Sequence, residues 1–154
     1  MKNKIHIIIA NLFCIIALVG LSIYIISVWK ELPDKIPIHF NAEGRIDDMS
    51  SKWSLIAVHV VNVGMFIFLS FVELCPKMWN VGVQITPTNK NKVYAICRNM
   101  ILSIKAITVL GVAYMTFCMS KNMNLGSNYV FIFIGMILVT IIVHFILLHK
   151  LDKQ

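Results

Sequence analysis

The stretch from Ile5 to Trp29, IHIIIANLFCIIALVGLSIYIISVW, contains no Asp, Glu, Lys or Arg in 25 residues. At about 1.5 Å per residue, a helix of this length crosses a bilayer core of roughly 30 Å with some tilt. A secretory signal would have an apolar core of only about 7–15 residues followed by a small-residue cleavage site. We therefore predict a membrane-spanning helix over about 5–29.

Three further apolar runs, at about 53–74, 99–119 and 129–149, are also of spanning length. The composition agrees, because 58% of the residues are hydrophobic and only 14% are charged. These values exclude a soluble enzyme, a coiled coil and a disordered tail. A helix satisfies its own backbone in lipid, so residues 1–154 are predicted to form a single domain, an all-α integral membrane protein with four transmembrane helices.

The basic residues flank the apolar runs and predict an orientation. The formal net charge is +7, but the charges do not form one basic stripe, so the bilayer and not nucleic acid is the predicted partner. One side carries eight basic residues, Lys2, Lys4, Lys77, Lys90, Lys92, Arg98, Lys150 and Lys153. The other side carries five, Lys30, Lys35, Arg45, Lys52 and Lys121. The positive-inside rule then places both termini in the cytoplasm and residues 30–52 outside.

The segment between the first two runs, LPDKIPIHFNAEGRIDDMSSKW at residues 32–53, is the most distinctive part of the chain. Pro33 and Pro37 fix their own φ and favour extended geometry in the residues before them. Apolar side chains then alternate with others over residues 36–41, which predicts a short strand. Its apolar face, formed by Ile36, Ile38 and Phe40, is expected to lie on the membrane surface. Residues 41–44 are predicted to form a turn.

The pattern Leu-Pro-x-x-Ile-Pro-x-His-Phe-Asn-x-x-Gly, followed by Asp and by Ser-Lys-Trp, resembles the extracytoplasmic loop of a bacterial membrane domain of unknown function. That domain forms the N-terminal half of SdpI-type immunity proteins, which continue into further spans. The resemblance implies a location in the bacterial cytoplasmic membrane and protection from a secreted toxic peptide. In some members protection is joined to sequestration of a transcriptional repressor. The matching positions are Pro33, Pro37, His39, Phe40, Asn41, Gly44 and Lys52.

Each loop position has a structural and a functional interpretation. The prolines and Gly44 are explained by the backbone geometry of a tight loop. His39 either hydrogen-bonds within the loop or contacts a ligand or metal, since imidazole serves both purposes. The acids Glu43, Asp47 and Asp48 are either solvated or bind a divalent cation.

Polar residues inside the spans are functional candidates because they are costly in lipid. In the run 53–74, His59, Asn62, Ser70 and Glu73 are offset by 3, 8 and 3 residues and so share one helix face. Arg98 and Lys105 share one side of the next helix. The cluster is interpreted either as interhelical packing with Lys105 snorkelling to the headgroups, or as a pair of Glu73 with Arg98 or Lys105 lining a cavity. Asn11 and His144 are further candidates for such a network.

No catalytic or cofactor motif accompanies these residues. The chain lacks HExxH, GxSxG, a P-loop and a dinucleotide-binding turn, and its four cysteines form no zinc-binding spacing. We therefore predict no enzyme activity, metal or cofactor, and free thiols. The leading functional hypothesis is an immunity or resistance factor that recognises an antimicrobial peptide or its membrane target. The alternatives are a sensor or accessory subunit that binds a cytoplasmic partner through residues 77–98, and an enzyme using His39 with the loop carboxylates. Assembly as a homo-oligomer stays open.

The predicted orientation can be tested by cysteine labelling. In a background lacking the four native cysteines, Ser50→Cys is expected to react with an impermeant maleimide in intact cells, because the loop 30–52 is predicted to be outside. Thr88→Cys, between the second and third spans, is expected to stay unlabelled until the membrane is permeabilised. The reverse labelling pattern would invert the orientation.

Overall fold

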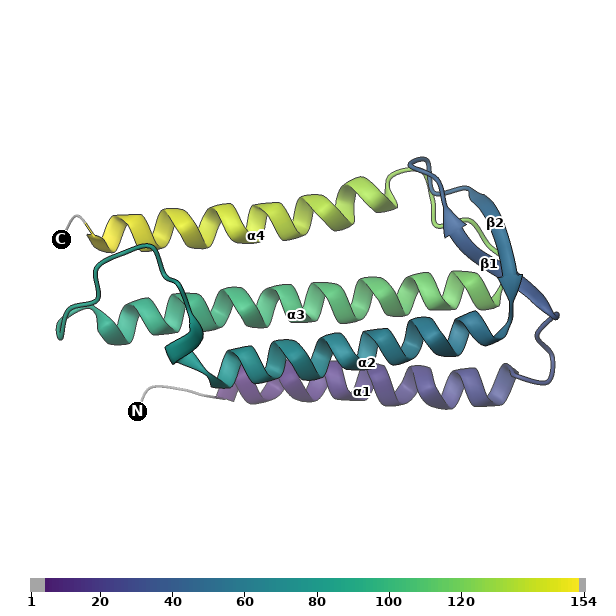
Figure 1. Cartoon of the computed structure of the whole chain (residues 1–154), viewed down its shortest axis with the longest axis horizontal. Helices are drawn as coiled ribbons and strands as arrows, with labels where there is room; N and C mark the ends of the chain where they lie inside the picture. The colour runs from purple at the N-terminus through teal and green to yellow at the C-terminus, as the bar shows by residue number, and fades with distance from the viewer. Residues whose placement is uncertain (1–4, 153–154) are drawn as a thin grey trace.

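A computed structural model describes residues 5–152, and this part of the chain contains four long helices that follow the predicted spans (Figure 1). They are α1 (Ile5–Val28), α2 (Trp53–Leu74), α3 (Lys90–Ser120) and α4 (Tyr129–Asp152), with a short 3-10 helix, η1 (Pro76–Met78), after α2. Each long helix is apolar and long enough to cross a membrane, so the chain is a multi-pass membrane protein. Lys2, Lys4 and Lys153, which entered the orientation argument, lie outside the described residues.

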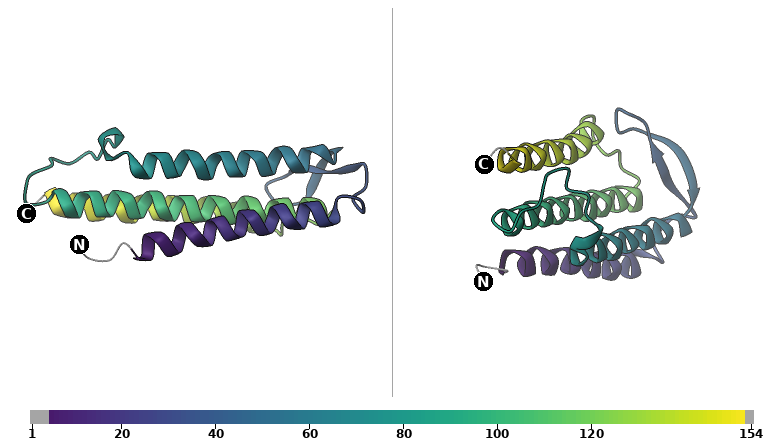
Figure 2. Two further views of the ribbon diagram at one scale, coloured as in Figure 1. Left: turned by 90° about the horizontal axis from the view of Figure 1, so that it is seen from below. Right: turned by 60° about the vertical axis from the view of Figure 1, so that its left-hand side comes forward.

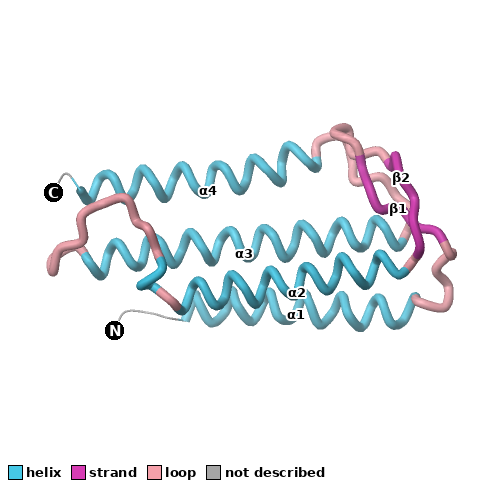
Figure 3. Tube along the Cα trace, in the orientation of Figure 1, coloured by secondary structure: helices cyan, strands magenta, loops and turns pink. Residues whose placement is uncertain are grey.

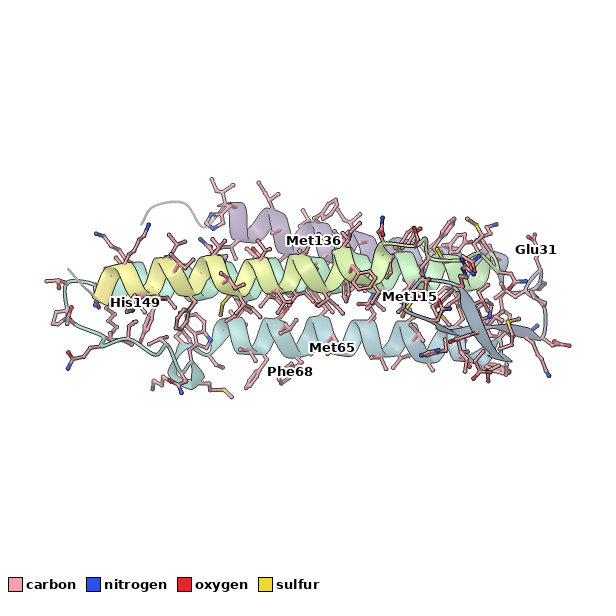
Figure 4. The ribbon with its side chains drawn as sticks, turned by 90° about the horizontal axis from the view of Figure 1, so that it is seen from above. Glu31, Met65, Phe68, Met115, Met136 and His149 are labelled. Carbon is pink, nitrogen blue, oxygen red and sulfur yellow. The ribbon has the colours of Figure 1, made fainter. Side chains whose placement is uncertain are left out.

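The four helices run alongside one another, with α3 in the centre. The helices α1 and α2 both pack against α3, and α4 packs against it from another side (Figures 1 and 2). The start of α1 and the end of α4 lie at one end of the molecule, here called the terminal end. In a view onto α4, Phe68 of α2 projects away from the other helices (Figure 4). Such apolar side chains face outward, as expected of a surface in contact with lipid.

The helix α3 begins at Lys90, so the predicted start near 99 is wrong. Residues 90–98 are too polar to be counted as part of an apolar run. They are helical because Val93 and Cys97 are buried on one face and pack with Leu148 of α4. A turn also precedes the helix, in which the side chain of Asn89 accepts from the N–H of Thr86 at 2.8 Å. Tertiary packing of one face therefore extends the helix beyond its apolar stretch. At the same end of the fold, α4 continues to Asp152, past the predicted residue 149 (Figure 1).

The segment between α1 and α2 forms an antiparallel hairpin of β1 (Lys35–Phe40) and β2 (Ile46–Ser51), coloured magenta in Figure 3. The sequence predicted β1 but not β2, because IDDMSS is polar and lacks alternation. The predicted apolar face is wrong: Ile36 and its neighbour Pro37 are both buried, whereas Ile38 is 38% exposed. The pairing register is irregular on both sides of His39, and such an irregularity interrupts strict alternation.

The hairpin packs on the ends of the helices farthest from the terminal end, here called the hairpin end (Figure 1). Leu32 and Ile36 belong to a core cluster shared by three helices, with Leu21, Ile25, Leu55 and Met119. The hairpin is therefore an ordered cap on the helix ends, held by buried apolar contacts. All four cysteines are free thiols, as predicted.

Candidate functional site

A tight turn joins the two strands and is held by its own hydrogen bonds. The N–H of Gly44 donates to the carbonyl of Asn41, and the N–H of Asn41 donates to the carbonyl of Arg45, both at 2.9 Å. The side-chain Oδ1 of Asn41 also accepts from the N–H of Arg45 at 2.9 Å. Gly44 has a φ of +72°, a conformation that side chains rarely tolerate. The predicted turn is present, and Asn41 and Gly44 maintain its backbone.

The turn docks on the loop between α3 and α4. The carbonyl of Gly44 accepts from the N–H of Leu125 at 2.8 Å, and the side chain of Asn124 accepts from the N–H of Ile46 at 3.0 Å. A Cβ atom at Gly44 would overlap the carbonyl of Gly126. Glycine is thus needed at position 44 both for its φ and for the close approach of the two loops. This contact connects the first half of the chain to the last helix.

His39 points its imidazole at a carboxylate on the opposite strand. Its Nδ1 lies 2.6 Å from Oδ1 of Asp47, and the two side chains are 68% and 40% exposed. An ionised carboxylate only accepts hydrogen bonds, so Nδ1 carries the proton that it donates. The bond orients the ring and leaves Nε2 available to a ligand. The expected hydrogen bond of His39 within the loop is present, and it is compatible with a ligand contact.

An apolar groove of about 330 Å³ lies beside His39, where the hairpin meets α3 and α4. Its lining consists of Ile38, His39 and Phe40 from β1, Val112 and Met115 from α3, and Leu125, Tyr129, Val130, Phe133 and Ile134 from the last loop and α4. The wall formed by α4 is fixed, because the hydroxyl of Tyr129 donates to the carbonyl of Gly111 at 2.6 Å. The groove offers apolar contact area next to one imidazole, a combination that suits an amphipathic ligand.

The remaining loop candidates lie in different environments. Pro33 is exposed, whereas Pro37 is buried beneath the hairpin, and Phe40 forms part of the groove wall. Lys52 lies with its ammonium 5.5 Å from the ring centroid of Trp29. The acids Glu43, Asp47 and Asp48 are exposed, and no group of three or more potential metal ligands occurs within residues 5–152.

A second polar cluster lies inside the helices and centres on Lys105. This side chain is fully buried, and its Nζ lies 2.6 Å from Oε2 of Glu73. It also donates to the side chains of Asn11 at 2.5 Å and Ser70 at 3.1 Å. The three donors of the ammonium are thus matched by oxygens from α1 and α2. A buried charge in lipid is tolerated when it is paired in this way.

The other polar residues of α2 face the same helices nearer the hairpin end. Nδ2 of Asn62 donates to the carbonyl of Val109 at 3.1 Å. The hydroxyl of Ser22 donates to the carbonyl of Leu18, so the 2.7 Å contact between Ser22 and His59 requires that Nε2 of His59 donates. Nδ1 of His59 and Oδ1 of Asn62 are buried without a partner among the described residues. The cluster around Lys105 is therefore the more completely satisfied of the two.

The structure corrects three expectations about these residues. Lys105 does not snorkel, because α3 begins well before it and its ammonium turns inward to Glu73. Arg98 forms no ion pair with any residue in the range 5–152, and Glu73 pairs with Lys105 instead. His144 stays outside the network, because its Nδ1 contacts the carbonyl of Thr140 in its own helix at 2.7 Å.

Sequence reasoning missed the residues that complete the groove. Asn124 and Gly126 anchor the hairpin, and Tyr129 and Phe133 form the far wall. The Asn and Gly pair is a turn signal, but a turn signal does not reveal which segment packs on the turn. Tyr129 lies at the start of an apolar run, and its hydrogen bond to α3 depends on the close approach of the helices at Gly111.

Comparison with known proteins finds a family model that is similar to part of the chain. Residues 12–63 match DUF1648, a domain of unknown function. The match begins in α1, includes the whole hairpin and ends in α2 just past Asn62. No curated protein and no solved structure matches the chain. The matched region therefore contains the loop motif, while Lys105 and the α4 wall of the groove lie outside it.

The Lys105 cluster can be tested through stability. Lys105→Met leaves the Glu73 carboxylate buried without its partner and is expected to lower the free energy of unfolding by about 3–5 kcal/mol. The double variant Lys105→Met/Glu73→Gln removes both charges and should recover a large part of this loss. Denaturant unfolding of the purified protein in detergent measures both effects.

The matched control is Lys121→Met, which removes an exposed lysine that directly follows the last residue of the same helix at the hairpin end. Its expected effect is within about 0.5 kcal/mol. Equal stability of Lys105→Met and Lys121→Met would show that the buried pair does not hold the helices together.

Proposed function

We propose that this chain is a bacterial membrane immunity or resistance factor that recognises a secreted antimicrobial peptide or the membrane target of that peptide. The observation that carries the proposal is the apolar groove beside the hairpin, with the imidazole of His39 at its edge. The loop motif that resembles SdpI-type immunity proteins forms this hairpin. Recognition is assigned to the groove, and the immunity function itself rests on the resemblance.

The groove has the chemistry that a membrane-active peptide requires. Such peptides are amphipathic, with apolar side chains on one face and polar groups on the other. The groove walls formed by Phe40, Met115 and Phe133 offer apolar surface to the apolar face of such a peptide. For the polar face, the exposed His39 offers a hydrogen-bond acceptor and the exposed Asp47 offers a negative charge. A ligand bound here would lie at the boundary between the spans and the hairpin.

The rigidity of the hairpin supports recognition by a preformed surface. The turn is hydrogen-bonded internally, docks on Leu125 and Asn124, and rests on the buried side chains of Ile36 and Pro37. A surface that is ordered before binding loses less conformational entropy when the ligand arrives. The backbone of the hairpin is therefore expected to matter for function as much as its exposed side chains.

Protection assays test this function directly. A sensitive bacterial host producing the chain is expected to survive at least about tenfold more of a secreted membrane-active peptide than the empty-vector host. The panel of peptides includes any toxin encoded beside this gene. At equal membrane levels, His39→Ala, Pro37→Ala and Gly44→Val should each abolish most of the protection, the last because a branched side chain meets Gly126 at a positive φ.

Gly82→Val is the matched control, because Gly82 also has a positive φ but a Cβ there meets no neighbouring atom. A host that produces Gly82→Val should survive the peptide nearly as well as a host that produces the parent protein. If His39→Ala alone is harmful, the hairpin is a flexible carrier of one side chain and the preformed surface is wrong. If no peptide distinguishes the parent protein from the empty vector, the immunity function loses its basis.

A second candidate function, a sensor or accessory subunit that binds a cytoplasmic partner, is favoured by a groove at the terminal end. This groove of about 700 Å³ is lined by residues 85–87 together with Lys90, Asn91 and Tyr94. The segment before α3 is ordered, since Trp79 and Val83 pack with Val93 and Cys97. An ordered, basic surface suits an acidic protein segment, and it suits anionic lipid headgroups as well.

Photo-crosslinking separates these two occupants. A benzophenone amino acid at Ile85 or Asn91 is expected to form protein adducts in cells if the sensor function holds. The same probe at Ser50 in the hairpin serves as the control, because it should not reach a cytoplasmic protein in the predicted orientation. Lipid adducts alone at Ile85 and Asn91 would count against a protein partner.

A further inference from the structure

A second apolar groove lies at the hairpin end, between the last turn of α1 and the first turn of α2. It has a volume of about 310 Å³. Its lining combines three isoleucines with two tryptophans and one lysine: Ile25, Ile26, Ile56, Trp29, Trp53 and Lys30. Ile26 is 75% exposed, so the groove continues onto the outward face of α1. The proposed immunity function does not use this groove.

The two tryptophans are placed at the helix ends that border the groove. α1 ends at Val28 and α2 begins at Trp53, and the rings of Trp29 and Trp53 meet at a centroid distance of 4.9 Å and an angle of 62°. Neither indole N–H donates to a residue in the range 5–152, whereas the indole of Trp79 donates to the carbonyl of Val72 at 2.7 Å. Tryptophans at such positions lie at the headgroup level, where their N–H groups donate to lipid oxygens.

Two lysines bring positive charge to the same place. Lys30 lines the groove and has no ion pair within the described part of the chain. The ammonium of Lys52 lies 5.5 Å from the ring centroid of Trp29, and its contact with Asp34 is long, at 3.7 Å to a carboxylate that is almost fully exposed. Glu31 and Asp34 are the nearby acids along the chain, and both are exposed to solvent. Lys30 and the two tryptophans therefore line the apolar groove, and the ammonium of Lys52 lies beside one of these tryptophans.

We propose that this groove is a binding site for an anionic phospholipid. An acyl chain lies along Ile25, Ile26 and Ile56, and the phosphate receives hydrogen bonds from Lys30, Lys52 and the indole N–H groups. The charge of the two lysines selects an anionic lipid over a zwitterionic one. This site gives a role to Lys52 and to Trp53, the tryptophan that follows it in the loop motif. Neither residue lines the groove beside His39. This inference stands independently of the immunity proposal.

Quenching of tryptophan fluorescence by brominated lipids tests the site. The chain has three tryptophans, so a Trp79→Phe background leaves Trp29 and Trp53 as the reporters. The full chain is placed in phosphatidylcholine nanodiscs that contain increasing fractions of dibrominated phosphatidylglycerol or dibrominated phosphatidylcholine. Half-maximal quenching is expected at an about tenfold lower fraction of the brominated phosphatidylglycerol, because two lysines attract its charge.

Lys30→Gln/Lys52→Gln should remove this preference, and Lys90→Gln/Lys92→Gln, which removes the same charge at the terminal end, should retain it. If the first double variant does not fold, Lys30→Gln alone is measured, since this exposed side chain does not support the fold. It should reduce the preference about threefold. Equal quenching by the two lipids in the parent protein would mean ordinary lipid contact and overturn the proposal. An undiminished preference in Lys30→Gln would overturn it as well.

Discussion

The buried ammonium of Lys105 is the constraint on which the arrangement of the helices depends. A charged amine inside a membrane protein is unfavourable unless oxygens replace its water shell. Here those oxygens come from Asn11 on α1 and from Ser70 and Glu73 on α2. Apolar packing alone distinguishes poorly between one helix face and another, because lipid is as apolar as the helix surface. Pairing of this charge therefore favours one rotation of α1 and α2 about their axes and one position of each along α3.

The central position of α3 also determines where ligands can bind. Its last turns and the following loop receive the turn of the hairpin through Leu125 and Asn124, which brings β1 beside α4. The groove next to His39 exists because these three parts of the chain meet there. The groove at Trp29 and Trp53 has a different origin, since it lies between the ends of α1 and α2. The hairpin end thus carries two apolar grooves, one proposed for a peptide and one for a lipid.

The extent of the DUF1648 match has a structural meaning. Residues 12–63 include the hairpin, both tryptophans of the lipid groove and the polar residues His59 and Asn62. They do not include Lys105 or the aromatic wall of α4. The matched region therefore supplies the cap and the groove proposed for a lipid, and the later helices supply the central charge and the far side of the groove beside His39. A difference in α3 or α4 would change the apolar wall beside His39 without changing the motif.

The sequence by itself determined the number of spans, the approximate bounds of α1, α2 and α4, the strand β1 and the turn at Gly44. These features depend on local chemistry: long apolar runs must be helical in lipid, prolines favour extended residues, and glycine permits a positive φ. The offsets along α2 also placed Asn62 and Glu73 on a common face, because helix periodicity is local.

Only the tertiary structure decided the features that depend on a distant neighbour. The start of α3 at Lys90 depends on packing of Val93 and Cys97 with α4, and the polar strand β2 depends on pairing with β1. The sequence around Lys105 does not indicate whether its side chain turns to the headgroups or inward. Its direction depends on Glu73, which lies on another helix. The groove beside His39 is likewise formed by residues more than 70 positions away in the chain. Periodicity and propensity act over a few residues, so contacts across such separations are fixed only when the helices pack.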